Sequence, residues 1–407
     1  MSALLLQDGM LRNGRRVDVA ISDATITAVV PSGQAVLGKA DTVDLGGRLI
    51  LPALGEPHAH LDKAFTADAF PNPNGDLIGA IEAIRTGWET MTVDDIFARA
   101  SKAARRLVAS GTTAIRTHAD VTKDAVSMSM DALVEVKRSL AGVCHMEVAA
   151  LGFPVTGPEG QEGRRAQERA IAAGADLVGG APHLEDDPEA AIAFALALAA
   201  GNDLAVDLHL DEILDASVQH LAELARQTEQ AGMGGRVTAS HCVSHGLLSP
   251  REQRAVGRLL ADAGVSVVTL PRTNLFLQAR GREQAAPRGL AGVRALLDTG
   301  VLVAGGADNV QDPFYVVGRS DPLETASLLV TAAHLTVAES FQLVTDGVRR
   351  VMGLEPARVE AGSPADMIVV SAASVREAIA DQPEERIVIH QGRVVARTAV
   401  ETWMAEA

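Results

Sequence analysis

The sequence is poor in cysteine. Only Cys144 and Cys242 occur among 407 residues, which excludes a disulfide framework. Such sparing use of cysteine is typical of the reducing cytoplasm, where we expect this protein to reside. The short apolar run at residues 4–6 has no basic leader before it, so no signal peptide is expected.

Basic charge and long apolar runs are scarce as well. Lys and Arg number 36 against 52 Asp and Glu, which leaves a net charge of −16. Nucleic acids and anionic membranes both select basic surfaces, so neither is expected as a partner. The longest apolar stretch, Ala190–Ala200, is too short to span a bilayer. With 47% hydrophobic and 22% charged residues, the chain is typical of a globular protein of two or three domains.

The middle of the chain repeats one unit, in which a short β-rich apolar run ends in polar residues and precedes an amphipathic stretch. Strands are predicted at Arg48–Leu54, Gly111–His118, Gly142–Phe153, Ala175–His183, Leu204–Glu212, Val237–Cys242, Val265–Pro271 and Val301–Asp308. Helices are predicted between them, among others at Val93–Ser110, Pro188–Ala200, Ser217–Gly232, Pro250–Gly264 and Arg288–Gly300. Eight strands that alternate with helices predict an α/β fold, a (β/α)8 TIM-type barrel.

The two ends of the chain have a different pattern. Apolar and polar residues alternate around turn signals at Leu4–Val30, Asp366–Val370 and Arg386–Val395. This pattern predicts that both ends pair into one small β-sandwich domain beside the barrel. We therefore expect the small domain at residues 1–52 and 355–407 and the barrel at residues 53–354.

Histidines and acids stand where the predicted barrel strands end, which is the edge that carries the active site of such barrels. The first strand runs into His58 and His60, whose i, i+2 spacing on an extended segment points both rings to one side. Later strands end at His209, at His241 and at Asp308. Three histidine nitrogens and one carboxylate suit a divalent cation such as Zn²⁺, which activates a bound water at neutral pH.

Glu212 follows His209 by three residues and is placed to shuttle protons as a carboxylate that is not a ligand. His241 is expected to hydrogen-bond the activated water or to polarise the substrate. A single His-x-His pair is weak evidence, and the shared placement of all these residues at strand ends carries the prediction. His118 and His183 also close strands, and each is either a pocket-wall or a structural residue.

Two absences narrow the chemistry. The predicted strand Ala175–His183 holds no lysine, whereas binuclear barrel hydrolases commonly bridge their two metals through a modified lysine on strand four. One metal ion is therefore expected. The other known motif of metal-dependent deaminases, His-x-Glu followed by Pro-Cys-x-x-Cys, is also absent. Two widely separated cysteines cannot supply it, so this type of zinc site is excluded.

Several segments resemble the amidohydrolase superfamily, and within it the branch of bacterial cytosine deaminase and N-isopropylammelide amidohydrolase. They lie in matching order over nearly the whole chain: residues 56–63 (EPHAHLDK), 116–121 (RTHADV), 174–180 (GADLVGG), 209–212 (HLDE), 239–241 (ASH), 274–278 (NLFLQ) and 308–313 (DNVQDP). The resemblance implies one Zn²⁺ or Fe²⁺ ion per subunit and commonly a homo-oligomer. Its implied ligands are His58, His60, His209 and Asp308. The catalytic residues that it implies are Glu212, His241 and Asp308, the last as proton acceptor from the attacking water.

The substrate end departs from cytosine deaminase. Val155 stands after Phe153-Pro154, where that enzyme has a glutamine that reads the pyrimidine, and Asn309 stands in place of a second aspartate. Phe314 replaces a tryptophan. These departures argue against unmodified cytosine as the substrate. We expect the substrate to contact Lys63, His118, Phe153, Asn309 and Phe314.

Lys63 resembles the ammelide hydrolase branch more closely. Its cation either holds an anionic oxygen of the substrate or pairs with Asp62 or another loop acid. The segment 66–93 that follows is either a lid or an interface.

The sequence thus predicts a metal-dependent deaminase of a small nitrogen heterocycle such as a pyrimidine or triazine. Hydrolysis of a cyclic amide or of an N-alkylamino-substituted ring is the alternative within enzymes. A non-catalytic metal-binding barrel is the alternative outside them.

Overall fold

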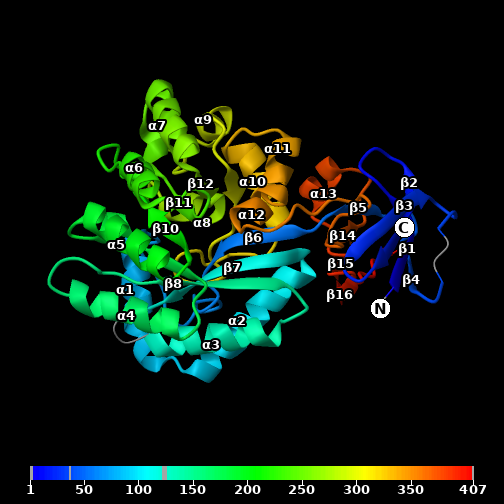
Figure 1. Cartoon of the computed structure of the whole chain (residues 1–407), viewed down its shortest axis with the longest axis horizontal. Coiled ribbons are helices and arrows are strands. Elements are labelled where there is room, and N and C mark those ends of the chain that lie inside the picture. Colours follow the sequence, from blue (N-terminus) through cyan, green and yellow to red (C-terminus); the bar gives the residue numbers. More distant parts are fainter. Residues whose placement is uncertain (1–2, 36–37, 122–125, 406–407) are drawn as a thin grey trace.

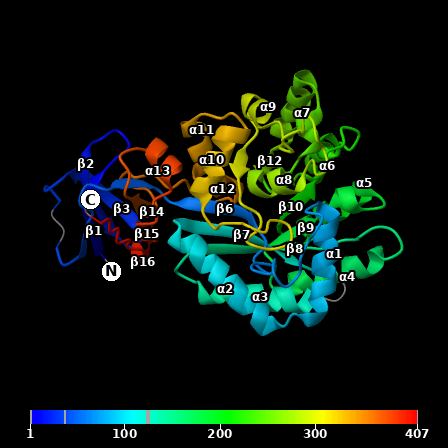
Figure 2. The ribbon, with the colours of Figure 1, turned by 180° about the vertical axis from the view of Figure 1, so that it is seen from behind.

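The computed structural model describes residues 3–35, 38–121 and 126–405. Its described strands form two separate sheets, and Figure 1 shows them side by side along the long axis of the molecule. Both chain termini lie at one of these sheets, the terminal sheet, which Figure 2 shows from behind.

One sheet is a parallel barrel whose strands follow one another in chain order. These strands are β6 (Leu54–Ala59), β7 (Thr112–Asp120), β8 (His145–Leu151), β9 (Leu177–Gly180), β10 (Ala205–Leu210), β11 (Val237–His241), β12 (Val265–Thr269) and β13 (Val303–Gly305). A parallel bridge between Ala59 and Asp308 joins the first strand to the chain just after the last. The predicted (β/α)8 barrel is confirmed.

Helices surround the barrel as an outer layer (Figure 1). They are α2 (Val93–Ala109), α3 (Val126–Ser139), α4 (Gly160–Ala172), α5 (Pro188–Gly201), α6 (Leu221–Ala231), α7 (Pro250–Ala263), α8 (Pro271–Leu277), α9 (Val293–Asp298), α10 (Pro322–Ala332), α11 (Val337–Leu343) and α12 (Asp346–Val351). The short helices η2 (Pro182–Leu184) and η3 (Ser244–Leu247) follow β9 and β11. Local signals set several ends: Ser249 and Glu252 form a capping box at α7, and Gly264 ends that helix at φ +68°.

The terminal sheet contains strands from both chain ends, as predicted. Its strands are β1 (Ala3–Met10), β2 (Arg16–Ser22), β3 (Thr25–Pro31), β4 (Asp41–Asp44), β5 (Leu49–Pro52), β14 (Met367–Val370), β15 (Arg386–His390) and β16 (Arg393–Arg397). The order is β16-β15-β14-β5-β1-β2-β3, with β4 paired to β1. One apolar core includes side chains of β1, β2 and β3 together with those of β14 and β15, so the two halves of the sheet enclose a shared interior. Helix α13 (Val375–Asp381) connects β14 and β15.

The sequence interpretation was wrong about the first barrel strand. The predicted strand Arg48–Leu54 is divided between the two sheets: β5 pairs with β14 in the terminal sheet, and β6 begins the barrel at Leu54. The apolar run is continuous across Ala53, so its hydrophobicity does not mark the crossing from one sheet to the other.

Buried ion pairs fasten the terminal sheet to the barrel. Arg386 of β15 donates from both terminal nitrogens to the carboxylate of Asp321, the N-cap of α10, at 3.0 and 2.7 Å. Arg349 of α12 donates to Asp366 at 2.9 Å, and His390 contacts the other oxygen of that carboxylate at 2.8 Å. The two sheets are therefore joined by buried, hydrogen-bonded ion pairs.

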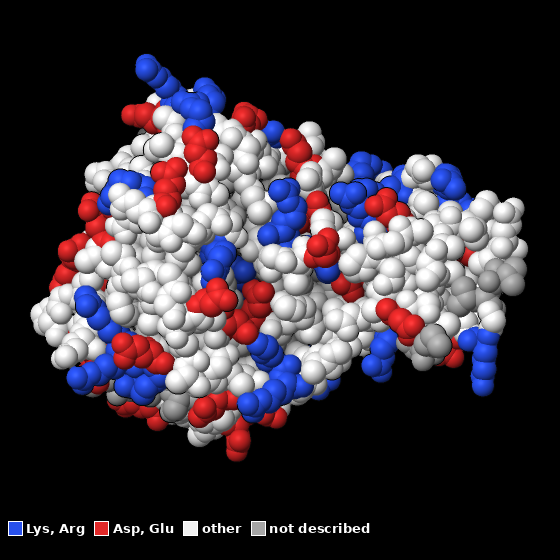
Figure 3. Space-filling view, viewed as in Figure 1, with Lys and Arg blue, Asp and Glu red and all other residues white. Residues whose placement is uncertain are grey.

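The surface is mixed in charge. On the face shown in Figure 3, Lys and Arg stand among Asp and Glu and form no continuous basic area. Among the residues described, none of the helices has the length and apolar character that crossing a membrane requires.

Candidate active site

A cavity of about 300 Å³ opens at the carboxyl ends of the barrel strands. Its polar lining comes from the ends of β6, β10, β11 and β13, and its apolar wall comes partly from segment 66–93. In this segment α1 (Leu77–Gly87) and η1 (Trp88–Thr90) place Ile84 and Trp88 against the cavity. The segment that the sequence left undecided between lid and interface thus covers the cavity.

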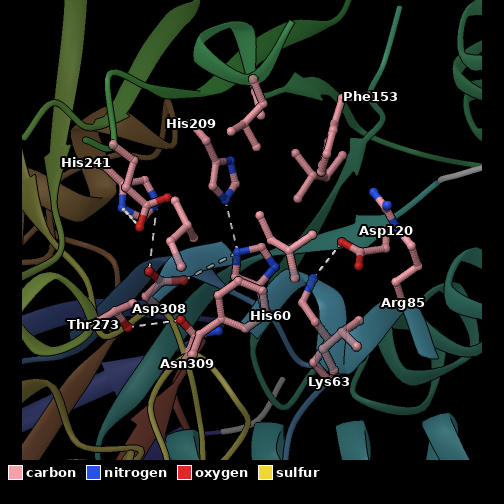
Figure 4. A pocket seen from close by; sticks show the side chains of 18 of the residues that line it. His60, Lys63, Arg85, Asp120, Phe153, His209, His241, Thr273, Asp308 and Asn309 are labelled. Carbon is pink, nitrogen blue, oxygen red and sulfur yellow. Dashed lines mark hydrogen bonds and ion pairs between the residues drawn. The ribbon is translucent and has the colours of Figure 1, made fainter. Parts of the chain in front are cut away.

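The four predicted metal ligands converge at the base of this cavity. Nε2 of His209 lies 3.1 Å from Nε2 of His58 and 3.0 Å from Nε2 of His60. Oδ1 of Asp308 lies 3.3 Å from Nε2 of His60 and 3.9 Å from Nε2 of His58. Figure 4 shows His60, His209 and Asp308 turned toward one point.

Barrel closure brings the first and last of these residues together. The backbone N–H of Asp308 donates to the carbonyl of His58, and the N–H of His60 donates to the carbonyl of Asp308, both at 3.0 Å. Beneath them, the buried carboxyl of Glu56 accepts from the N–H groups of His58 and Ala307. Asp308 and His241 both adopt φ +71°, a left-handed conformation that few non-glycine residues take.

The cluster leaves buried polar atoms without partners, namely Nδ1 of His60, Nδ1 of His209, Nε2 of His241 and Oδ2 of Asp308. Burial lowers the pKa of His60 and His209 well below the ordinary range, so both rings are neutral and offer lone pairs. Converging imidazole nitrogens and a carboxylate oxygen are the donor set of a divalent cation, and the distances between these atoms fit one. Within 4.8 Å of one another lie donor atoms of His58, His118 and His209, and likewise of His58, His241 and Asp308.

Glu212 and His241 lie beside this cluster. Nδ1 of His241 lies 3.2 Å from Oε1 of Glu212 and 3.1 Å from Nδ2 of Asn274. Nε2 of His241 lies 3.8 Å from Oδ2 of Asp308. Burial, with the charge of Asp308, raises the pKa of Glu212 well above its usual value. Burial also raises the pKa of Asp308, to about 6.

A chain of buried groups supports His58 from inside the barrel. Nδ1 of His58 lies 3.0 Å from Oγ of Ser240, which donates to Oδ1 of Asp207 at 2.7 Å. Arg116 donates to the second oxygen of Asp207 at 2.9 Å. This chain favours the His58 tautomer that carries its proton on Nδ1 and keeps the Nε2 lone pair toward the cavity base. The sequence analysis missed it, although Asp207 and His209 share the i, i+2 spacing that placed His58 and His60.

Most of the predicted substrate residues line the cavity. Lys63, Phe153, Asn309 and Phe314 are among its lining residues, as is His183. His118 is fully buried and does not line it. Its ring packs 4.1 Å from that of His58, with both nitrogens unpartnered and one of them grouped with those of His58 and His209. Its position is therefore behind the histidine cluster rather than on the cavity wall.

Three further charged lining residues were missed from the sequence, namely Asp120, Arg85 and Glu159. Asp120 ends β7 two residues after His118, so strand alternation was a usable signal for it. Arg85 lies in the last turn of α1, where a basic residue is ordinary, and nothing local marks it as a cavity residue.

Comparison with known proteins agrees with this geometry. A model described as "Amidohydrolase family" matches residues 92–404. A pterin deaminase of Rhizobium rhizogenes is 30% identical over 94% of this chain and 88% of its own length. A solved 5-methylcytosine deaminase of Klebsiella pneumoniae, liganded with 5-fluorocytosine, is 28% identical and covers 98% of this chain and 99% of its own, with a TM-score of 0.88. An N-isopropylammelide isopropylaminohydrolase of Burkholderia multivorans is 29% identical over 98% of this chain and 99% of its own, with a TM-score of 0.84.

The resemblance drawn from the sequence motifs is thereby confirmed. The matched residues cover most of the barrel and the C-terminal part of the terminal sheet, and the likeness in fold extends over nearly the whole chain. The chain belongs to the amidohydrolase family.

Proposed function

We propose that the protein is a metal-dependent hydrolytic deaminase of a small nitrogen heterocycle. The observation that carries this proposal is the convergence of His58, His60, His209 and Asp308 within 3.0–3.9 Å, with Glu212 beside them. The pterin and 5-methylcytosine deaminases among the relatives support the reaction type.

The four convergent side chains would hold one divalent ion. Such an ion supplies Lewis acidity and lowers the pKa of water toward neutrality. Ser240 and Asp207 orient His58 for this purpose, and the backbone bonds of Asp308 fix its carboxylate opposite the imidazoles. We propose Zn²⁺ as the ion, with Fe²⁺ as the alternative, because nitrogen and oxygen donors of this kind suit both.

Glu212 moves the protons. Its raised pKa favours the protonated carboxyl, so Glu212 can donate its proton to a ring nitrogen. The carboxylate then takes up the proton of the hydroxyl group added to the ring carbon and passes it to the departing amine. Asp308, whose pKa is raised to about 6, accepts a proton from the attacking water. Burial lowers the pKa of His241 well below its usual range, so the ring is neutral. Its Nδ1 lies against Glu212, and its unpartnered Nε2 is free to hydrogen-bond the attacking water.

A second candidate reaction is hydrolysis of an N-alkylamino substituent or of a cyclic amide. The specific support is an N-isopropylammelide isopropyl amidohydrolase of Pseudomonas sp., 27% identical over 88% of this chain and 89% of its own length. The scarcity of cysteine supports a cytoplasmic location, and the scarcity of basic charge supports an enzyme that binds neither nucleic acid nor membrane. We also propose that the enzyme is a homo-oligomer.

The test is ammonia release across a panel of pyrimidines, triazines, pteridines and lactams. The protein is assayed as purified, after metal chelation, and after addition of Zn²⁺ or Fe²⁺. We expect ammonia from at least one ring, loss of activity on chelation and recovery with one of the ions. Release of an alkylamine or ring opening without ammonia would select the second candidate. Full activity in protein shown by metal analysis to be free of divalent ions would exclude the mechanism.

A further inference from the structure

An ion pair stands in the cavity wall away from Glu212. Nζ of Lys63 donates to Oδ1 of Asp120 at 2.5 Å, and both residues line the cavity. Figure 4 shows the pair on the side of His60 opposite His241. The sequence left open whether Lys63 contacts the substrate or pairs with an acid. In the structure Lys63 pairs with an acid, and both side chains still line the cavity.

Surrounding bonds hold the pair in place. The backbone N–H of Asp120 donates to Oδ2 of Asp62, and the Oγ of Thr66 donates to the carbonyl of Lys63. Arg99 donates to the carbonyls on both sides of Lys63, at Asp62 and Ala64. The chain segments that carry the two charges are therefore anchored independently of any ligand.

The pair has unused hydrogen-bonding capacity. The side chain of Lys63 is 3% exposed, yet its ammonium group, which carries three donors, has Asp120 as its one hydrogen-bond acceptor among the described residues. Oδ2 of Asp120 has no hydrogen-bond donor among them. A buried ammonium and a carboxylate that are both left with free positions toward a cavity are matched by a ligand that supplies one acceptor and one donor.

Within the ion pair, the charge balance disfavours an anionic group that contacts both side chains, while Arg85 adds a cation elsewhere on the cavity lining. Burial alone would lower the pKa of Lys63, but the charges of Asp120 and Asp62 outweigh it and raise that pKa. Lys63 is therefore a cation already neutralised by Asp120. A carboxylate on the substrate would approach Asp120 as well as Lys63 and would be repelled by it.

We propose that Lys63 and Asp120 together bind a lactam edge of the substrate, the adjacent ring C=O and N–H of an oxo-heterocycle, while the amino group to be hydrolysed lies near Glu212. Lys63 donates to the carbonyl oxygen, and Asp120 accepts from the ring N–H. The inference rests on the proposed function and names its substrate class, the amino-oxo heterocycles. The sequence analysis expected Lys63 to hold an anionic oxygen of the substrate. The present proposal adds a contact from Asp120 and requires that the bound edge of the ring be neutral.

The two contacts match in geometry. In a lactam the carbonyl oxygen and the N–H hydrogen point the same way, so the partner must present a donor and an acceptor side by side. Nζ of Lys63 and the Asp120 carboxylate are side by side, because they are already in direct contact. A ring that is alkylated on the oxygen loses the N–H and replaces it by a lone pair that faces Asp120, which is unfavourable.

The experiment compares pterin with 2-amino-4-methoxypteridine, which keeps the amino group and lacks the lactam edge. Each charged hydrogen bond contributes roughly 10–100-fold, so we expect wild-type kcat/KM to favour pterin by at least 10-fold. Lys63→Met should lower kcat/KM for pterin by about 10–100-fold, mainly through KM, and change it little for the methoxy ring. The preference for pterin over the methoxy ring should be lost in the same way in the double variant Lys63→Met/Asp120→Leu. This variant removes both charges, so it leaves no unpaired buried charge.

The matched control is Lys137→Met. Lys137 makes an ion pair of the same 2.5 Å length with Asp176 outside this cavity, and its loss should leave the discrimination unchanged. Equal kcat/KM for the two rings in the wild type would overturn the proposal while deamination itself stands. So would a preference for a carboxylate-bearing ring that grows in Asp120→Asn. If neither ring releases ammonia, deamination of these rings is excluded, and calorimetric binding of the same two rings then decides whether the pair selects the lactam edge.

Discussion

Two buried polar clusters in this protein differ in how completely their groups are paired. At the junction of barrel and terminal sheet, Arg386 satisfies both oxygens of Asp321, and Asp366 is shared by Arg349 and His390. At the mouth of the barrel, atoms of His60, His209, His241 and Asp308 are equally buried but have no partner.

The difference indicates what each cluster is for. Unpaired buried polar groups cost stability, and a catalytic role or a bound ion is among the reasons for which native proteins retain them. Fully paired groups need no ligand and act in holding elements together. The mouth is therefore where substitution should affect chemistry, and the junction is where it should affect stability alone.

The largest expected effect is on turnover. Glu212→Gln removes the proton carrier and keeps the shape of the side chain, so kcat should fall by roughly 10²–10⁴-fold. Thermal unfolding should be unchanged or should shift upward, because a buried carboxyl whose pKa is raised by burial is replaced by a neutral amide. Ammonia assays and thermal denaturation measure the two results. An equal loss of activity and of folded protein would contradict the assignment of Glu212 to chemistry.

At the junction the expected effect is on stability. Arg386→Met leaves the buried Asp321 with the half-exposed Arg319, 3.3 Å away, as its remaining cation, which should lower the free energy of unfolding by up to about 3–5 kcal/mol. Chemical denaturation measures it, and kcat of the folded protein should change little. Arg386→Met/Asp321→Asn is the matched variant, since it removes both charges and keeps a residue that can cap α10. It should recover much of the loss, and no recovery would show that packing rather than charge holds the junction.

A smaller effect is expected behind His58. Ser240→Ala removes the bridge to Asp207, so the affinity for a divalent ion should fall by about 10–100-fold. Metal retained during dialysis against a chelator measures this without an activity assay. Ser266→Ala is the control, because Ser266 is also a buried hydroxyl inside the barrel but hydrogen-bonds Thr238 and the Val237 carbonyl. Equal metal loss in the two variants would contradict a specific role of Ser240 in metal binding.

The smallest expected effect is on the pH dependence of stability. Although burial opposes it, the hydrogen bond from His390 and the charge of Arg349 hold the pKa of Asp366 below its usual value. A carboxyl with a depressed pKa stabilises the fold above its unfolded-state pKa of about 4, and this contribution is lost as pH falls through the folded-state value. Asp366→Asn should therefore lower stability at pH 7 by about 1 kcal/mol and narrow that gap in acid. Denaturation curves at pH 7, 5 and 3 measure it, and a gap that widens in acid would contradict the sign.

The sequence predicted those parts of the fold that depend on patterns among neighbouring residues. Alternation of strand and helix and glycine at helix ends are local, and they predicted the barrel and the pairing of the two chain ends. The division at Ala53 was not predictable from them, because the apolar run continues from β5 through Ala53 to Leu54, the first residue of β6, and the two strands differ in which partner strand they meet.

The site was predicted to a similar extent. The positions of His58, His60, His209 and Asp308 at strand ends were visible in the sequence, since the carboxyl ends of parallel strands meet at one edge. The cover formed by α1, with Trp88 and Arg85, was not, because a long segment between elements has no local pattern that fixes where it folds back.

The sequence by itself determined the chemical types of the site residues and their order around the barrel, because strand periodicity and family motifs are properties of neighbouring residues. Only the tertiary structure decided that His118 lies behind the cluster and that Lys63 meets Asp120, 57 positions away. Alternation along a strand determines which face a side chain occupies. Which side chains then touch across the barrel depends on strand stagger and closure, and these are fixed when all eight strands pack together.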